Sequence, residues 1–103
     1  MKLRTITAEH AARFSRHLRE QERSPGTVEK YTRDVRALAT WLNGAPTTHG
    51  GTAAWRDGLL DRGYAPVTVN SMVAAVNHFF HFLGWEDCKV KALRIQRRLF
   101  RDD

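Results

Sequence analysis

The sequence contains one cysteine, Cys88, and no long apolar stretch. A single cysteine excludes an internal disulfide, and its free thiol is better tolerated in a reducing compartment. No apolar run approaches the roughly 18 residues of a membrane span. The first ten residues carry charges but lack the apolar block and cleavage site of a secretion signal. These absences predict a cytoplasmic protein without a membrane partner.

The sequence also lacks a glycine-rich phosphate loop and a catalytic constellation. His78, His81 and Cys88 are three potential metal ligands without a second closely spaced pair, which makes a poor zinc site. Tyr31 and Tyr64 have no neighbouring base or arginine cluster to activate a nucleophile. We therefore expect no metal, no cofactor and no catalysis by this chain. A metal-dependent hydrolase built on the histidines is a nominal alternative.

Acidic residues are scarce where basic residues gather. Lys and Arg outnumber Asp and Glu by 17 to 11, which gives a net charge of +6. Between Cys88 and Arg101 there is no acidic residue and there are six basic ones: Lys89, Lys91, Arg94, Arg97, Arg98 and Arg101. Such a run attracts phosphates through Coulomb forces and counterion release, so a polyanionic partner is expected. A solvated tail without a partner is the alternative.

Apolar spacing predicts four helices and no sheet, so the fold class is all-α. With 103 residues the chain fits one domain, and we expect two helical hairpins crossed on each other. The expected helices are residues 7–23 capped by Thr7, 25–43 capped by Ser24, 52–63 capped by Thr52, and 66–84. Residues 85–103 are compatible with either a loose helix or an extended basic strap.

The second and fourth predicted helices open alike, with PGTV at 25–28 and PVTV at 66–69, 41 residues later. At the same offset Tyr31, Val35, Leu38, Trp41 and Leu42 are matched by Met72, Val76, Phe79, Phe82 and Leu83. Helix N-termini present unpaired amides and the positive end of the dipole, so Thr27 and Thr68 are candidates to hold phosphates. The alternative is that Pro and Thr are simply good helix-start residues. Trp41 and Trp55 follow the helical spacing and are expected in the core.

Polar residues on these two helices are candidates for DNA contact. Lys30 and Arg33 lie on the polar side of the second helix, where they could reach phosphates or base edges. No residue between Arg62 and Glu86 is charged, histidines aside, so the fourth helix could enter a groove without acidic repulsion. Its neutral donors and acceptors are Asn70, Ser71 and Asn77.

Two segments carry a resemblance to a known family. SPGTVEKYTRDVRALATWL and APVTVNSMVAAVNHFFHFLG resemble the core-binding, SAM-like N-terminal domain of tyrosine recombinases, the phage integrase family. The matching residues are Thr27, Tyr31, Arg33 and Asp34, followed by Thr68, Asn70, Phe79, Phe80, Phe82, Leu83 and Gly84. The tail VKALRIQRRLF is similar to the interdomain linker of conjugative-transposon integrases.

The resemblance implies sequence-specific binding of duplex DNA at a recombination site. Residues 1–84 would be the helical DNA-binding domain, and 85–103 a basic linker to a catalytic domain that is absent from this chain, as in a truncated fragment. Together the two domains would form a C-shaped clamp around DNA. The expected partners are duplex DNA, the parent's catalytic domain and other recombinase subunits, with nucleoid association when DNA is bound.

The resemblance also assigns contacts to individual residues. Thr27 and Thr68 would contact phosphates. Base edges would face Lys30, Ser71 and Ala75, and the linker that crosses the DNA would begin at Lys89 and Lys91. The competing interpretation is a helical protein–protein interaction module, in which the NHFFHF segment exposes aromatic surface to another helix.

Overall fold

The structure, a computed structural model, describes residues 3–94, and its described part is helical without strands. The elements are α1 (Ala8–Glu20), α2 (Pro25–Leu42), α3 (His49–Asp61), α4 (Pro66–Leu83) and a short 3₁₀ helix, η1 (Glu86–Cys88). Residues 89–94 follow in an extended conformation. The predicted all-α class and its four helices are confirmed.

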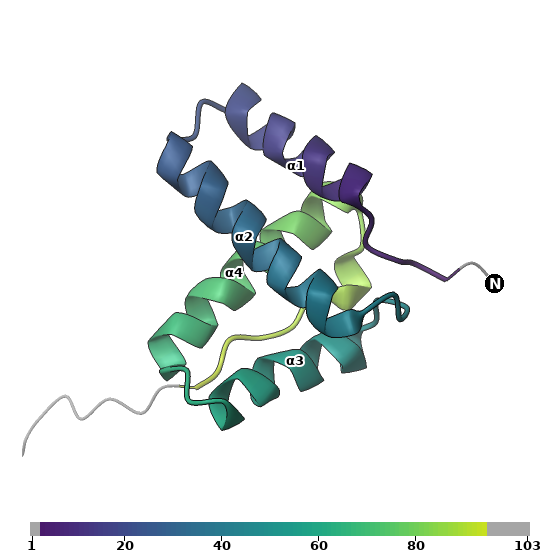
Figure 1. The fold of residues 1–103 in the computed structure, drawn as a ribbon, viewed down its shortest axis with the longest axis vertical. Coiled ribbons are helices and arrows are strands. Elements are labelled where there is room, and N and C mark those ends of the chain that lie inside the picture. The colour runs from purple at the N-terminus through teal and green to yellow at the C-terminus, as the bar shows by residue number, and fades with distance from the viewer. Residues whose placement is uncertain (1–2, 95–103) are drawn as a thin grey trace, which may run out of the picture.

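The core lies where two helical hairpins cross. The α1–α2 hairpin lies across the α3–α4 hairpin, with α2 crossing α4 (Figure 1). In three pairs of positions related by the 41-residue offset, both residues are buried in the core: Val28 and Val69, Val35 and Val76, and Leu38 and Phe79. The sequence echo therefore marks two helices that present equivalent apolar stripes to one core.

The predicted cap of the third helix is wrong by one turn. Thr48 is the N-cap, and its hydroxyl accepts a hydrogen bond of 2.9 Å from the amide of Gly51. Thr52 lies inside the helix, fully buried, and donates to the Thr48 carbonyl at 2.8 Å. Gly50 and Gly51 suggested a loop because glycine disfavours helices. Capping by Thr48 and burial of the helix face outweigh that preference.

Left-handed residues set the helix ends. Asn43 and Gly84 terminate α2 and α4 with φ of 51° and 78°, as their positions predicted. Gly63, with φ of 95°, follows the end of α3. The first helix stops at Glu20 rather than near Arg23. Glu22 adopts a positive φ of 61°, which turns the chain toward α2.

Packing explains only part of the uncharged character of α4. The helix contacts all the other elements, and seven of its residues are buried: Val69, Met72, Val73, Ala75, Val76, Phe79 and Phe80. Its exposed residues Pro66, Val67, Thr68, Ser71 and Ala74 are neutral as well. Even so, no helix in residues 3–94 is both long and apolar enough to span a bilayer.

Two expectations about apolar residues have different outcomes. Trp55 is buried in the core, as predicted, whereas Trp41 is 42% exposed, so its predicted core position is wrong. Trp41 lies in the last turn of α2, beyond the crossing with α4. Helical spacing identifies the face of a residue but not how far along the helix the core extends.

The packed fold continues past Gly84. Cys88 and Val90 are buried in the same core, and Trp85 and Leu93 pack against it. Of the two conformations considered for the C-terminal segment, residues 89–94 adopt the extended one. The division after Gly84 into domain and linker stays a prediction, and Arg97, Arg98 and Arg101 of the basic run lie outside the described residues.

Candidate nucleic-acid interface

A hollow of about 250 Å³ lies between α2 and the first turns of α4. It brings together four of the eight predicted DNA-contacting residues, Lys30, Arg33, Thr68 and Ser71. Asp34, Ala37, Tyr64 and Met72 complete its lining. Residues from two predicted contact helices, 41 positions apart in sequence, therefore share one concave surface.

Lys30 is held at the crossing of the two helices. Its ammonium donates to the Asp34 carboxylate at 2.6 Å and to the backbone carbonyl of Ser71 at 3.0 Å. Asp34 is only 3% exposed, so this ion pair compensates a carboxylate that has lost most of its water. Two of the three ammonium donors are used in these bonds, which leaves one for a ligand.

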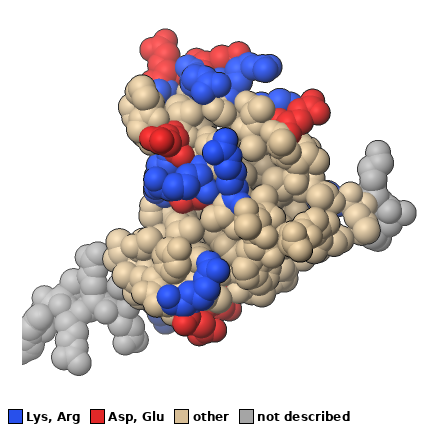
Figure 2. Space-filling view, in the orientation of Figure 1, with Lys and Arg blue, Asp and Glu red and all other residues tan. Residues whose placement is uncertain are grey.

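Arg33 is the second cation of the hollow and, unlike Lys30, has no ion-pair partner within residues 3–94. Its side chain is exposed. Glu29, one turn earlier on α2, likewise forms no ion pair within residues 3–94. Arg36 is exposed one turn further along α2. In Figure 2, blue basic side chains accordingly cross the middle of α2. A phosphate approaching the middle of α2 would meet the guanidinium groups of Arg33 and Arg36, which form no ion pair within residues 3–94.

The starts of α2 and α4 lie at the same edge of the molecule (Figure 1), but they differ chemically. At α2 the Ser24 hydroxyl accepts from the Thr27 amide at 3.2 Å and donates to the Thr27 hydroxyl at 3.0 Å. The N-cap of α4 is Ala65, which has no side chain that could cap. Pro66 has no N–H, so the amides of Val67 and Thr68 are the open donors. The α4 start thus has more open amide donors than the α2 start.

The chain from 11 to 87 matches the family model described as phage integrase, N-terminal SAM-like domain. This match covers more than half of the sequence. The chain belongs to the phage integrase family. The matched part is the family's N-terminal SAM-like domain, as the resemblance predicted. Comparison with curated proteins and with solved structures gave no significant match.

Three predicted contact residues of this integrase-family domain lie outside the hollow and have partners within the fold. Thr27 is half-buried and bonded to Ser24. The Asn70 amide pairs with the backbone of Leu93. The Lys89 ammonium lies 3.0 Å from Glu86. Hydrogen bonds from Lys89, and then from His81, lower the pKa of the Glu86 carboxyl below its usual range.

Two further residues have clear structural positions. Lys91 is exposed, and within residues 3–94 its one hydrogen bond is at the backbone carbonyl, which accepts from Arg56 at 2.8 Å. Ala75 is fully buried, so the expectation that it faces a base edge is wrong. It lies on the stripe of α4 that packs into the core, where a small side chain permits close helix approach.

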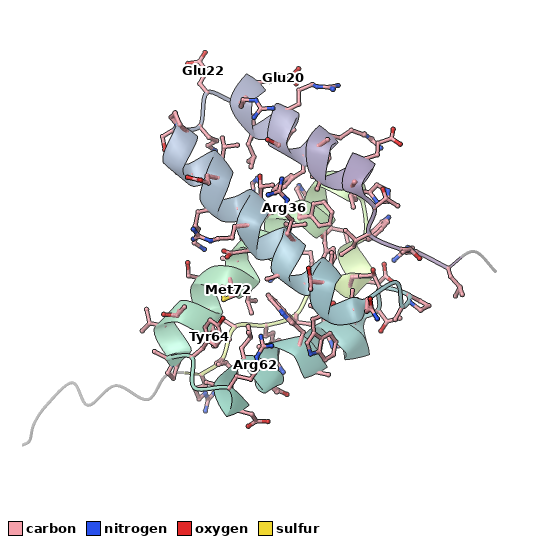
Figure 3. The ribbon with its side chains drawn as sticks, in the orientation of Figure 1. Glu20, Glu22, Arg36, Arg62, Tyr64 and Met72 are labelled. Atoms are coloured by element: carbon pink, nitrogen blue, oxygen red, sulfur yellow. The ribbon has the colours of Figure 1, made fainter. Side chains whose placement is uncertain are left out.

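Sequence reasoning missed Tyr64 and Arg62 at the edge of the hollow. Tyr64 is 42% exposed and lines the hollow, and the Arg62 guanidinium lies 5.8 Å from its ring centre. Figure 3 shows Tyr64 between Arg62 and Met72, and Arg36 on the α1 side of α2. The signal in the sequence was an arginine and an aromatic residue directly before a helix start. Both side chains could contact a phosphate backbone.

The histidines and the cysteine of the integrase-family domain have separate partners. His81 contacts Glu86 at 2.6 Å, His78 packs against the rings of Phe14 and Tyr31, and Cys88 is buried near Arg4. No group of three metal-ligating side chains occurs within residues 3–94.

The aromatic face expected of an interaction module is largely internal. Phe79 and Phe80 are fully buried, and Phe82 is half-buried against the ring of His17. The NHFFHF segment therefore contributes mainly to the core. Residues 3–94 do not expose the broad aromatic surface on which that alternative depended.

Proposed function

We propose that this chain binds duplex DNA as the core-binding domain of a site-specific tyrosine recombinase. The observation that carries the proposal is the hollow between α2 and α4, which gathers Lys30, Arg33, Thr68 and Ser71 on one surface. Its chemistry suits a phosphate backbone, because it combines cations, hydroxyl groups and open helix amides.

In this proposal one phosphate lies at the start of α4, held by the amides of Val67 and Thr68 and by the Thr68 hydroxyl. A neighbouring phosphate pairs with Arg33. Lys30 and Ser71, which also line the hollow, then face the base edges. Phosphate contacts fix the position of the duplex, and base contacts supply specificity. Thr27 flanks the same edge and is a peripheral contact.

Strand exchange belongs, in this proposal, to a catalytic domain of the parent recombinase. Residues 1–84 are the DNA-binding domain, and 85–103 form the linker toward that domain. Other recombinase subunits assemble on the same recombination site. The family match supports this assignment, and the cationic hollow supplies the physical basis for the DNA contact.

The proposal is tested by titrating a labelled duplex at several salt concentrations and measuring fluorescence anisotropy. Affinity for DNA falls with salt, and the slope of log K against log salt is about −0.9 for each neutralised phosphate. Arg33→Ala should weaken binding and flatten the slope by about 0.9, since one phosphate contact is lost.

Arg13→Ala is the matched control. The Arg13 guanidinium lies 5.9 Å from the ring centre of Phe82, near the opposite end of α4 from Thr68. Phe82 lies fourteen positions after Thr68 on the helix, or about 21 Å along its axis. Equal effects of the two arginine variants would refute the placement. DNA-independent self-association in light scattering, without DNA binding, would favour the interaction module.

A further inference from the structure

The extended segment 89–94 runs beside α3 and α4 (Figure 1) and is hydrogen-bonded to both helices. Two asparagines of α4 hold its backbone. The Asn77 amide donates to the Val90 carbonyl at 2.7 Å and accepts from the Val90 N–H at 3.0 Å. Asn70 makes the same pair with Leu93, at 3.0 and 2.6 Å. Each side-chain amide thus acts as a neighbouring β-strand would.

The spacing of the two asparagines matches the spacing of the two peptide groups. Asn70 and Asn77 are seven residues apart on α4, which corresponds to about 10.5 Å along a helix. Val90 and Leu93 are three residues apart, which corresponds to about 10 Å along an extended chain. The two clamps can therefore be satisfied together, in one register.

Two side chains of α3 also bind the segment. His49 Nδ1 lies 2.9 Å from the Lys89 carbonyl, and Arg56 donates to the Lys91 carbonyl at 2.8 Å. Val90 is buried against the core. A shift by one residue would turn the Val90 side chain away from the core and break the bonds from both helices.

The direction of the segment sets its position relative to the hollow. The segment runs antiparallel to α4, because Val90 pairs with Asn77 and Leu93 pairs with Asn70. It therefore ends level with the first turns of α4, on the opposite side of the helix from Thr68 of the hollow, since Asn70 follows Thr68 by about 200° around the helix axis. The charged side chains of Lys91 and Arg94 are exposed on it.

We propose that Asn70 and Asn77 are positioning residues that lock segment 89–94 in one register. The locked segment fixes Lys91 and Arg94 along the side of α4 opposite Thr68, where they contact phosphates other than those held at the hollow. The DNA part of this inference rests on the proposed function. It gives Asn70 a role through the segment in place of the direct DNA contact predicted from the sequence.

Hydrogen exchange of single amides tests the clamp without DNA. Asn77→Leu keeps side-chain size and charge but removes both bonds to Val90, so exchange of the Val90 amide should accelerate about tenfold or more. Asn70→Leu should do the same for Leu93. Asn43→Gly is the control, because it removes the remaining asparagine at a left-handed position that glycine tolerates. Unchanged exchange in both leucine variants would overturn the clamp.

A mutant cycle tests the positioning. Lys91→Ala with Arg94→Ala should flatten the salt slope by up to about 1.8, as two phosphate contacts are lost. In the Asn70→Leu, Asn77→Leu background the same pair of changes should have a clearly smaller effect. If that background does not fold, judged by circular dichroism, Asn77→Leu alone replaces it. Equal effects in both backgrounds would overturn the positioning role.

The two proposals fail in different ways. If the wild-type chain does not bind duplex DNA at low salt, the proposed function and the DNA part of this inference are both refuted. The exchange of the Val90 and Leu93 amides then still decides whether Asn70 and Asn77 hold the segment. If the wild type binds and the cycle shows no coupling, only the positioning role is refuted.

Discussion

The ammonium of Lys30 on α2 lies 3.0 Å from the backbone carbonyl of Ser71 on α4, and these two residues occupy equivalent positions of the internal echo, 41 residues apart. The helices therefore cross where their matched sequences coincide. The candidate site lies at this crossing, so the repeated pattern that builds the core also sets the position of the residues proposed to contact DNA.

Replacing Lys30 and replacing Arg33 should change the stability of the domain by different amounts, although both residues line the hollow. Lys30→Met leaves the buried Asp34 carboxylate without its cation, which should cost about 1–3 kcal/mol of unfolding free energy. Arg33→Met removes an exposed side chain and should change stability by less than about 0.5 kcal/mol. Urea denaturation measures both. Equal stability changes would contradict the structural role of the Lys30–Asp34 pair.

The open start of α4 leads to a second prediction. Ala65→Ser introduces the capping hydroxyl that Ser24 provides at α2, so the domain should gain about 1 kcal/mol of stability. The new hydroxyl occupies the Thr68 amide. DNA affinity should therefore fall roughly threefold to tenfold, as a hydrogen bond to phosphate is lost. Thermal melts and anisotropy titrations provide the two readouts.

Ser24→Ala is the control for that experiment. It removes the existing cap of α2 and should cost about 1 kcal/mol, without lowering DNA affinity at a temperature where the domain is folded. Stability and binding would then respond to the two caps independently. A stabilised Ala65→Ser variant with wild-type affinity would show that no phosphate binds at the start of α4.

His78 predicts a pH dependence of stability. Burial, followed by the charges of Arg23, His17 and His81, lowers the pKa of His78 below the ordinary histidine value of about 6.5. Below pH 6.5 the unfolded chain therefore binds a proton at His78 more readily than the folded chain does. The contribution of His78 to the free energy of unfolding is fully present above pH 6.5 and is lost as the pH falls below that value. In His78→Gln, urea midpoints should decline less between pH 7.5 and 5.5; an identical decline would contradict the assignment.

Truncation of a core aromatic residue should destabilise the domain far more than truncation of a half-exposed one. Phe79→Ala removes a fully buried ring and should destabilise the domain by about 3–5 kcal/mol. Trp41→Ala removes a ring that is 42% exposed and should cost about 1 kcal/mol or less. Chemical denaturation gives both values. A larger loss for Trp41→Ala would place that tryptophan in the core, as the sequence pattern alone suggested.

The fold was largely predictable because local signals and apolar spacing agreed. Proline at the first helical position, Ser24 as a cap and Gly84 as a left-handed end gave the bounds of α2 and α4 closely. The prediction from local signals failed at the start of α3, where tertiary packing determines which residue caps the helix. Thr52 has the chemistry of a cap, but burial places it inside α3.

The site was only partly predictable, because the sequence does not show which polar groups the fold itself uses. Lys30, Arg33, Thr68 and Ser71 were identified from their helix positions, and the structure brings them together. Asn70 had the same signal, yet its amide binds a backbone segment 23 residues away. Such long-range pairing has no local signature.

The most direct test of the account is a titration of the ¹⁵N-labelled chain with a duplex of mixed sequence at low salt, followed by amide chemical shifts. The account predicts that the largest changes cluster at Arg33, Val67, Thr68 and Ser71, with smaller changes at Thr27 and around Arg13. Changes centred on the α1 surface, or no changes at any of the four, would contradict the placement of DNA at the crossing of α2 and α4.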